Sequence, residues 1–315
     1  MKKKLQIKRV ALVSRVTWGV EALRTMLESS SRINICGVFT LPEEESRRHS
    51  NYASFADICY LNNLQLIETK NINNNIGTIK DMNLDYLFVL GWSQIISKEI
   101  INVPAKGCIG NHPTLLPRDR GRAPVSWQLI KGYRKSALTF FFIDEGVDSG
   151  DVIMQRPIIL TLEDTAMSFY RKIIDTGKKM LNEIIPLLIE DRVPRKPQNH
   201  RFATYLSQRR PEDGVIDWSI SSFALYNLIR GLTMPFPGAF TFFQGRKLYV
   251  WSAKVDSYVD LEDAPGFVIG IEEDGILVST GKGAILLTSV QFEGETEIGN
   301  FREDKVVSLI GKVLG

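Results

Sequence analysis

The chain has 315 residues, of which 44% are hydrophobic and 24% charged, and its formal net charge is +3 at pH 7. This length predicts two domains that each bury a core, and the composition is that of an ordinary soluble protein. The small net charge does not demand a nucleic-acid partner. No run approaches the roughly 20 apolar residues that would span a membrane.

The cysteines and histidines argue against disulfides and metal. Cys36, Cys59 and Cys108 are widely spaced among apolar neighbours, so we expect reduced, buried thiols in a cytoplasmic protein. With three histidines and no ligand-spaced cluster, a metal enzyme is not expected. The basic opening residues 2–4 precede an apolar run too short for a signal peptide, and a first strand is expected there instead.

Short β-rich runs alternate with helical patterns from residue 8 to about 190. Strands that alternate with helices predict a mostly parallel, Rossmann-like α/β sheet that is covered on both faces. The expected strands are 9–14, 33–40, 64–68, 84–91, 106–112, 136–144 and 151–160, and the expected helices are 19–29, 51–63 and 164–190.

The rest of the chain has a different pattern. Residues 191–205 are polar and contain two prolines, so we expect a linker between a catalytic domain, 1–190, and a second domain, 206–315. A helix at 219–233 is followed by a hairpin that turns at Gln244-Gly245 and by further short strands. Many short strands in about 100 residues predict a small OB-like β-barrel.

Two loops at strand ends carry the residues that indicate chemistry. The stretch "GNHPTLLPRDRGRAP" presents His112 where a strand ends, and "DEGVDSGD" follows another expected strand. Ligands bind beyond the carboxyl ends of parallel strands. An imidazole can take a proton from a nucleophile, and a neighbouring carboxylate orients the ring and favours imidazolium. The second loop also fits a tight polar turn, so the pairing depends on both loops meeting at one sheet edge.

These motifs carry a resemblance. "HPTLLPRDRGRAP", "GVDSGDVI" and "RRPEDGVIDW" resemble the folate-dependent formyltransferase family, over nearly the whole chain. The resemblance implies an enzyme with 10-formyltetrahydrofolate as the formyl donor and an amine as acceptor. It implies His112 and Asp148 as catalytic residues. It also implies a folate site lined by Trp92, Ser93, Gln94, Ile95 and Ile96 on one wall, and by Asp144, Glu145, Gly146 and Val147 on the other.

The acceptor stays open between branches of the family. The "GRAP" and "RRPEDGVIDW" motifs are most similar to the sugar-nucleotide N-formyltransferases, including the one acting on UDP-4-amino-4-deoxy-L-arabinose for lipopolysaccharide. A nucleotide-linked amino sugar is therefore expected, with Arg118, Arg120 and Arg122 as candidate diphosphate ligands. Methionyl-tRNA is the alternative acceptor, although residues 43–45 are acidic where the tRNA enzymes usually have more cations. A non-catalytic folate-binding protein and a homodimer also remain open.

One position departs from the family pattern. The family has Asn two residues before the catalytic His, but this chain has Gly110 there and Asn111 beside the His. Neighbouring side chains on a strand point to opposite faces. We expect Asn111 among the catalytic residues through a bulge that turns it inward. The alternative is another donor, such as a backbone N–H made accessible by Gly110.

Overall fold

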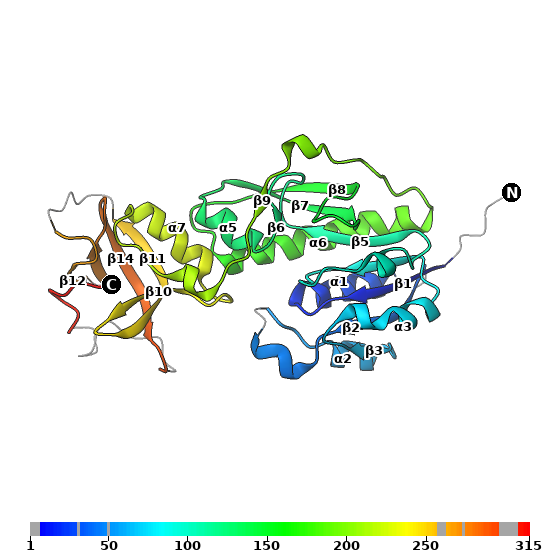
Figure 1. Ribbon diagram of the computed structural model, residues 1–315, viewed down its shortest axis with the longest axis horizontal. Helices are drawn as coiled ribbons and strands as arrows, with labels where there is room; N and C mark the ends of the chain where they lie inside the picture. The colour runs from blue at the N-terminus through cyan, green and yellow to red at the C-terminus, as the bar shows by residue number, and fades with distance from the viewer. Residues whose placement is uncertain (1–6, 30–31, 49–50, 257–262, 273–274, 296–307) are drawn as a thin grey trace. The chain divides into compact units, whose positions relative to one another are not determined.

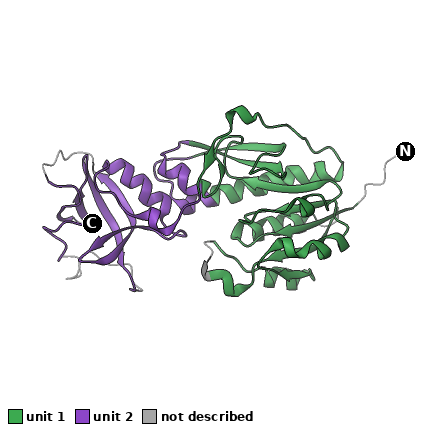
Figure 2. Cartoon of the chain, in the orientation of Figure 1, with its two compact units in different colours: residues 1–124, 135–159, 171–207 green, residues 125–134, 160–170, 208–315 purple. Residues whose placement is uncertain are grey.

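The computed structural model describes residues 7–29, 32–48, 51–256, 263–272, 275–295 and 308–315. The basic residues 2–4 discussed above lie outside this described part. The chain forms two compact units (Figure 2), each described by itself below. The first comprises residues 1–124, 135–159 and 171–207, and the second comprises residues 125–134, 160–170 and 208–315.

The first unit is built on a seven-stranded sheet in the order β3-β2-β1-β4-β5-β7-β8 (Figure 1). The first five of these strands run parallel, whereas β7 is antiparallel to β5 and β8 is antiparallel to β7. The sheet strands are β1 (Lys8–Val13), β2 (Ile33–Thr40), β3 (Leu66–Glu68), β4 (Tyr86–Val89), β5 (Gly107–His112), β7 (Lys135–Phe142) and β8 (Val152–Ile159). The predicted mostly parallel, Rossmann-like sheet is confirmed.

Apolar side chains cover both faces of this sheet. Cys108 of β5 belongs to a buried cluster that includes residues of α3 and α4. Trp18 of α1 packs on the other face, edge-on to Phe140 of β7, and a Cβ at Gly177 of α6 would clash with its indole ring. The α-helices with residues in this unit are α1 (Thr17–Glu28), α2 (Ala56–Leu61), α3 (Ile76–Asp81), α4 (Lys98–Ile101) and α6 (Ala166–Ile189).

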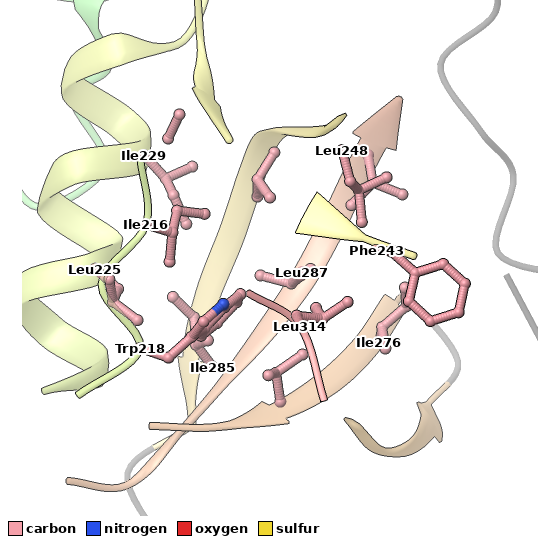
Figure 3. Close-up of a cluster of buried hydrophobic side chains, with 14 of the residues drawn as sticks. Ile216, Trp218, Leu225, Ile229, Phe243, Leu248, Ile276, Ile285, Leu287 and Leu314 are labelled. Carbon is pink, nitrogen blue, oxygen red and sulfur yellow. The ribbon is translucent and has the colours of Figure 1, made fainter. Parts of the chain in front are cut away.

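The second unit contains a five-stranded antiparallel sheet in the order β10-β11-β14-β13-β12. Its core packs α7 against this sheet, with Leu225 and Ile229 of the helix beside Leu287 and Ile285 of β14 (Figure 3). Gln244 and Gly245 both have positive φ, which is the conformation of a tight hairpin turn. The remaining elements here are α5 (Pro124–Ile130), α7 (Ser222–Leu232), β10 (Ala239–Phe243), β11 (Arg246–Asp256), β12 (Val268–Glu272), β13 (Gly275–Ser279) and β14 (Ala284–Phe292). The predicted small β domain is confirmed.

The unit boundaries differ from the expected domain limits. Residues 191–207 cluster with the first unit, whereas 125–134 and 160–170 cluster with the second. The position of residues 160–170 is explained by Arg230 of α7. Its buried guanidinium donates to the carbonyl oxygens of Thr161 (3.2 Å) and Asp164 (2.7 Å). The expected linker contributes a two-residue strand, β9 (Tyr205–Leu206), which pairs with β6 (Arg120–Gly121) beside His112.

Candidate active site

His112 is the last residue of β5, and its side chain is only 7% exposed. Its Nε2 lies 2.8 Å from the carbonyl oxygen of Asp119. A carbonyl oxygen can only accept, so Nε2 carries a proton and donates it. In the neutral ring this leaves Nδ1 unprotonated and able to accept a proton.

Asp148 lies beside that free nitrogen. Its Oδ2 is 3.5 Å from Nδ1 of His112 and accepts a 2.8 Å hydrogen bond from the backbone N–H of Gly121. The carboxylate side chain is 21% exposed. An imidazolium formed at His112 therefore meets a negative charge that is already held in place, and such pre-aimed charge requires no reorganisation during a reaction.

The loop that carries Asp148 follows β7 and is closely packed at Gly150. A Cβ at Gly150 would lie 1.9 Å from the carbonyl oxygen of Phe142. Asp144 accepts hydrogen bonds from the N–H of Gly146 (3.1 Å) and from Oγ of Ser149 (2.6 Å). The "DEGVDSGD" motif is thus a tight polar turn that also presents a carboxylate, so the two interpretations of this segment are compatible.

An ion pair links the two predicted walls of the folate site. Lys98, just after the first wall, forms a 2.8 Å ion pair with Glu145 of the second, and this hydrogen bond raises the pKa of Lys98. Ile95 and Val147 are exposed apolar side chains, one on each wall. Ser93 and Gly146, which were also predicted, are exposed. The Asp144 side chain bonds within its own turn. Ile96 is buried in a hydrophobic cluster against which Trp92 packs.

Gln94 holds the first wall in position rather than facing outward. Its side chain accepts from the N–H of Ile72 (3.2 Å) and donates to the carbonyl oxygen of Lys70. Asn73 donates to the carbonyl oxygen of Ile95 (3.0 Å). These bonds fix the 92–97 loop against the short 3-10 turn at 72–75.

The three predicted arginines have different environments. Arg118 and Arg122 are exposed, and Arg122 donates to the carbonyl oxygen of Ser93 (3.3 Å). Arg120 is 1% exposed and donates to Gln198 (2.7 Å) and to the hydroxyl of Tyr205 (3.2 Å). Its guanidinium is committed to the protein interior, which leaves Arg118 and Arg122 as candidate phosphate ligands.

The expectation that Asn111 faces the site is not met. The indole N–H of Trp18 donates to Oδ1 of Asn111 (3.1 Å), and Trp18 lies on the opposite face of the sheet from the Cys108 cluster. Gly110 shares the face of His112, but a Cβ there would lie 3.0 Å from Cγ1 of Ile143. An isoleucine thus occupies the space beside the position where the family has its Asn.

A surface hollow of about 620 Å³ lies at the start, rather than the end, of β4 and β5. It is remote from the catalytic pair, because parallel strands begin at the edge opposite to the one where they end. Its lining residues are Ile76, Lys80, Asn83, Leu84, Glu99, Asn102, Val103 and Ala105.

Within the described ranges, no group of three or more His, Cys, Asp or Glu residues could hold a metal ion. None of the described helices is long and apolar enough to cross a membrane.

Residues 8–185 match the family model described as formyl transferase, and residues 209–300 match the formyl transferase C-terminal domain. The chain belongs to the formyl transferase family. Family membership makes this chain an enzyme that transfers formyl groups, as its motifs predicted. The match to 209–300 covers most of the second unit, which contains the antiparallel five-stranded sheet.

Relatives with similar sequences bear the name methionyl-tRNA formyltransferase. One from Alkaliphilus oremlandii is 32% identical over 90% of this chain and 91% of its own length. Another from Desulforamulus reducens is 36% identical over 78% of this chain and 77% of its own. Among solved structures, WlaRD, a sugar 3N-formyl transferase crystallised with dTDP and 5-N-formyl-THF, superposes with a TM-score of 0.65. It shares 18% identity over 92% of this chain and 99% of its own, which is a likeness of fold.

Proposed function

We propose that this protein transfers the formyl group of 10-formyltetrahydrofolate to the primary amine of methionyl-tRNA. One observation carries the proposed chemistry: the Nε2–H bond of His112 to Asp119 leaves Nδ1 as a base beside the Asp148 carboxylate. The exposed apolar side chains of Ile95 and Val147 fit a flat aromatic donor.

The proposed reaction needs one proton carrier. The amine attacks the formyl carbon, and its surplus proton passes to Nδ1 of His112. The resulting imidazolium, held by Asp148, faces the oxyanion of the tetrahedral intermediate. The bond from carbon to N10 of the folate then breaks, and the proton moves from His112 to N10. The products are the N-formyl amine and tetrahydrofolate.

The acceptor is proposed from the sequence comparisons. Relatives 28–36% identical that match this chain over 78–92% of its length are named for methionyl-tRNA. Likeness to the sugar formyltransferases is weaker in sequence, at 18% for WlaRD. This evidence supports tRNA over the amino sugar that the "GRAP" motif favours.

A nucleotide-linked amino sugar is the second candidate. Arg118 and Arg122 are exposed close to the site and can bind a diphosphate. The acidic residues 43–45 begin a 3-10 turn and would oppose a phosphate backbone. Both acceptors present a primary amine to the same catalytic pair.

Initial rates with each acceptor test the proposal. The enzyme is incubated with 10-formyltetrahydrofolate and either methionyl-tRNA or a panel of UDP- and dTDP-linked amino sugars. We expect transfer to methionyl-tRNA with a kcat/KM that falls steeply as salt rises, since phosphate contacts release counterions. Transfer to a sugar nucleotide alone would establish the second candidate, and transfer to none would refute the function.

A further inference from the structure

We propose that Gln198 is a positioning residue for formyl transfer and acts through the loop that carries Asp148. The proposal rests on the proposed function in one respect only, namely that Asp148 stabilises the imidazolium of His112. Gln198 lies in the polar segment 191–205, which the sequence predicts to be a linker. Its side chain is nevertheless buried.

Gln198 binds the backbone at the residue of the catalytic carboxylate and two residues after it. Its Nε2 donates to the carbonyl oxygen of Asp148 (2.9 Å) and to that of Gly150 (2.7 Å). Both protons of the amide are therefore used on one short loop.

Arg120 fixes the direction of this amide. Its Nη2 donates to Oε1 of Gln198 at 2.7 Å, and a guanidinium can only donate. The amide oxygen must therefore face Arg120, and the amide nitrogen must face the loop. The hydroxyl of Tyr205, 3.2 Å from Nη1, further restrains the guanidinium.

Thr204, in the same stretch of chain as Gln198, binds the residues that contact the catalytic pair. The hydroxyl of Thr204 accepts from the N–H of Asp119 (2.8 Å), and the carbonyl oxygen of Thr204 accepts from the N–H of Arg120 (2.9 Å). Asp119 in turn accepts from His112, and Gly121 donates to Asp148. Thr204 thus holds the His112 side while Gln198 holds the Asp148 side.

The backbone at Asp148 explains why such a brace is needed. Asp148 has a φ of 49°, in the left-handed region, which aspartate adopts more readily than most residues but still at a cost relative to negative φ. Without the two bonds from Gln198, the loop would be free to relax to a more favourable φ. That relaxation would move the carboxylate away from Nδ1 of His112, and displacements of about 1 Å can cost about 100-fold in rate.

The test replaces Gln198 by Met, which keeps the length of the side chain but has no donor. We expect kcat to fall by about 10- to 100-fold while KM for the folate changes by less than about threefold. The matched control is Asn199→Ala, because Asn199 is exposed and only accepts from the N–H of Arg201 in its own turn. This control should keep the wild-type kcat.

A double mutant separates positioning from general stability. If Gln198 acts through Asp148, adding Gln198→Met to Asp148→Asn should lower kcat no further than about threefold. If the two losses instead multiply, or if Gln198→Met alone keeps the wild-type kcat, the proposal is wrong.

Hydrogen exchange gives a readout that needs no turnover. The amide of Gly121 donates to the carboxylate of Asp148, so Gln198→Met should speed its exchange at least about tenfold while amides in β1 and β4 are unchanged. Unchanged exchange at Gly121 would overturn the proposal even in an active enzyme. Faster exchange at Gly121 in Gln198→Met, together with a wild-type protein that formylates no acceptor, would refute the proposed function and leave the brace established.

Discussion

Replacing Asp148 by Asn removes one negative charge from the proposed site and little else. The amide oxygen of Asn can still accept from the N–H of Gly121, so the loop is expected to stay in place. The lost term is the attraction between the carboxylate and a protonated His112, whose Nδ1 is 3.5 Å away. At that distance the attraction is about 1 kcal/mol in bulk water and about 5 kcal/mol at an effective dielectric constant near 20.

These limits convert directly to rates. Each 1.36 kcal/mol changes a rate tenfold, so kcat should fall between about 5-fold and about 5000-fold. We expect about 100-fold, because the Asp148 side chain is partly exposed to solvent. The assay is single-turnover transfer of labelled formyl groups, with folate affinity measured separately by fluorescence titration.

The control makes the same chemical change at an exposed carboxylate. Asp175→Asn on α6 should keep the wild-type rate within about twofold, as surface substitutions away from special features usually do. An Asp148→Asn enzyme with wild-type kcat and normal folate affinity would refute the electrostatic role of this carboxylate.

Three further outcomes concern residues around the site and in the core. Gly150→Ala places a methyl group 1.9 Å from a carbonyl oxygen of β7, so it should lower the free energy of unfolding by about 2 to 4 kcal/mol. Calorimetry should show a Tm lower by about 5 to 15 °C, and an unchanged Tm would contradict this. Gly110→Asn should lower the free energy of unfolding in urea by about 1 to 3 kcal/mol, because the new side chain contacts Ile143. Adding Ile143→Ala should give a double variant that is less destabilised than the sum of the two single variants. Simple additivity would refute the contact. Burial raises the pKa of Cys59 to about 11 and that of Cys108 to about 12, so both thiols stay protonated at pH 8 and should react with a thiol reagent only after unfolding. Modification of either in the native protein would contradict that environment.

The core of the site was predictable because it depends on local signals. His112 ends an apolar strand and Asp148 follows another, which the sequence indicates. Because β7 runs antiparallel to β5, the two strands end at opposite edges of the sheet, and the loop after β7 brings Asp148 back to His112. The mostly parallel sheet, the small β domain and the Gln244 turn follow from periodicity and turn residues in the same way.

The supports of the site were not predictable, since they join residues far apart in sequence. Arg120 and Gln198 are separated by 78 positions, and both are polar, so hydropathy predicts exposure for each. A buried polar network is stable only when its members satisfy one another, and no periodic pattern encodes that pairing. For the same reason, 191–205 had the sequence of a linker although it packs against the catalytic loops. Likewise, Asn111 could be excluded only when its bond to Trp18 was seen.

Transfer of a formyl group by the wild-type enzyme and by His112→Asn tests the central claim most directly. Each protein is mixed with 10-formyltetrahydrofolate and methionyl-tRNA, and N-formylmethionyl-tRNA is counted alongside released tetrahydrofolate. We predict one formyl group transferred per tetrahydrofolate released by the wild type, and a rate at least about 100-fold lower for His112→Asn with folate affinity retained. Equal rates for the two proteins would contradict the assignment of His112 as the base on which this account depends.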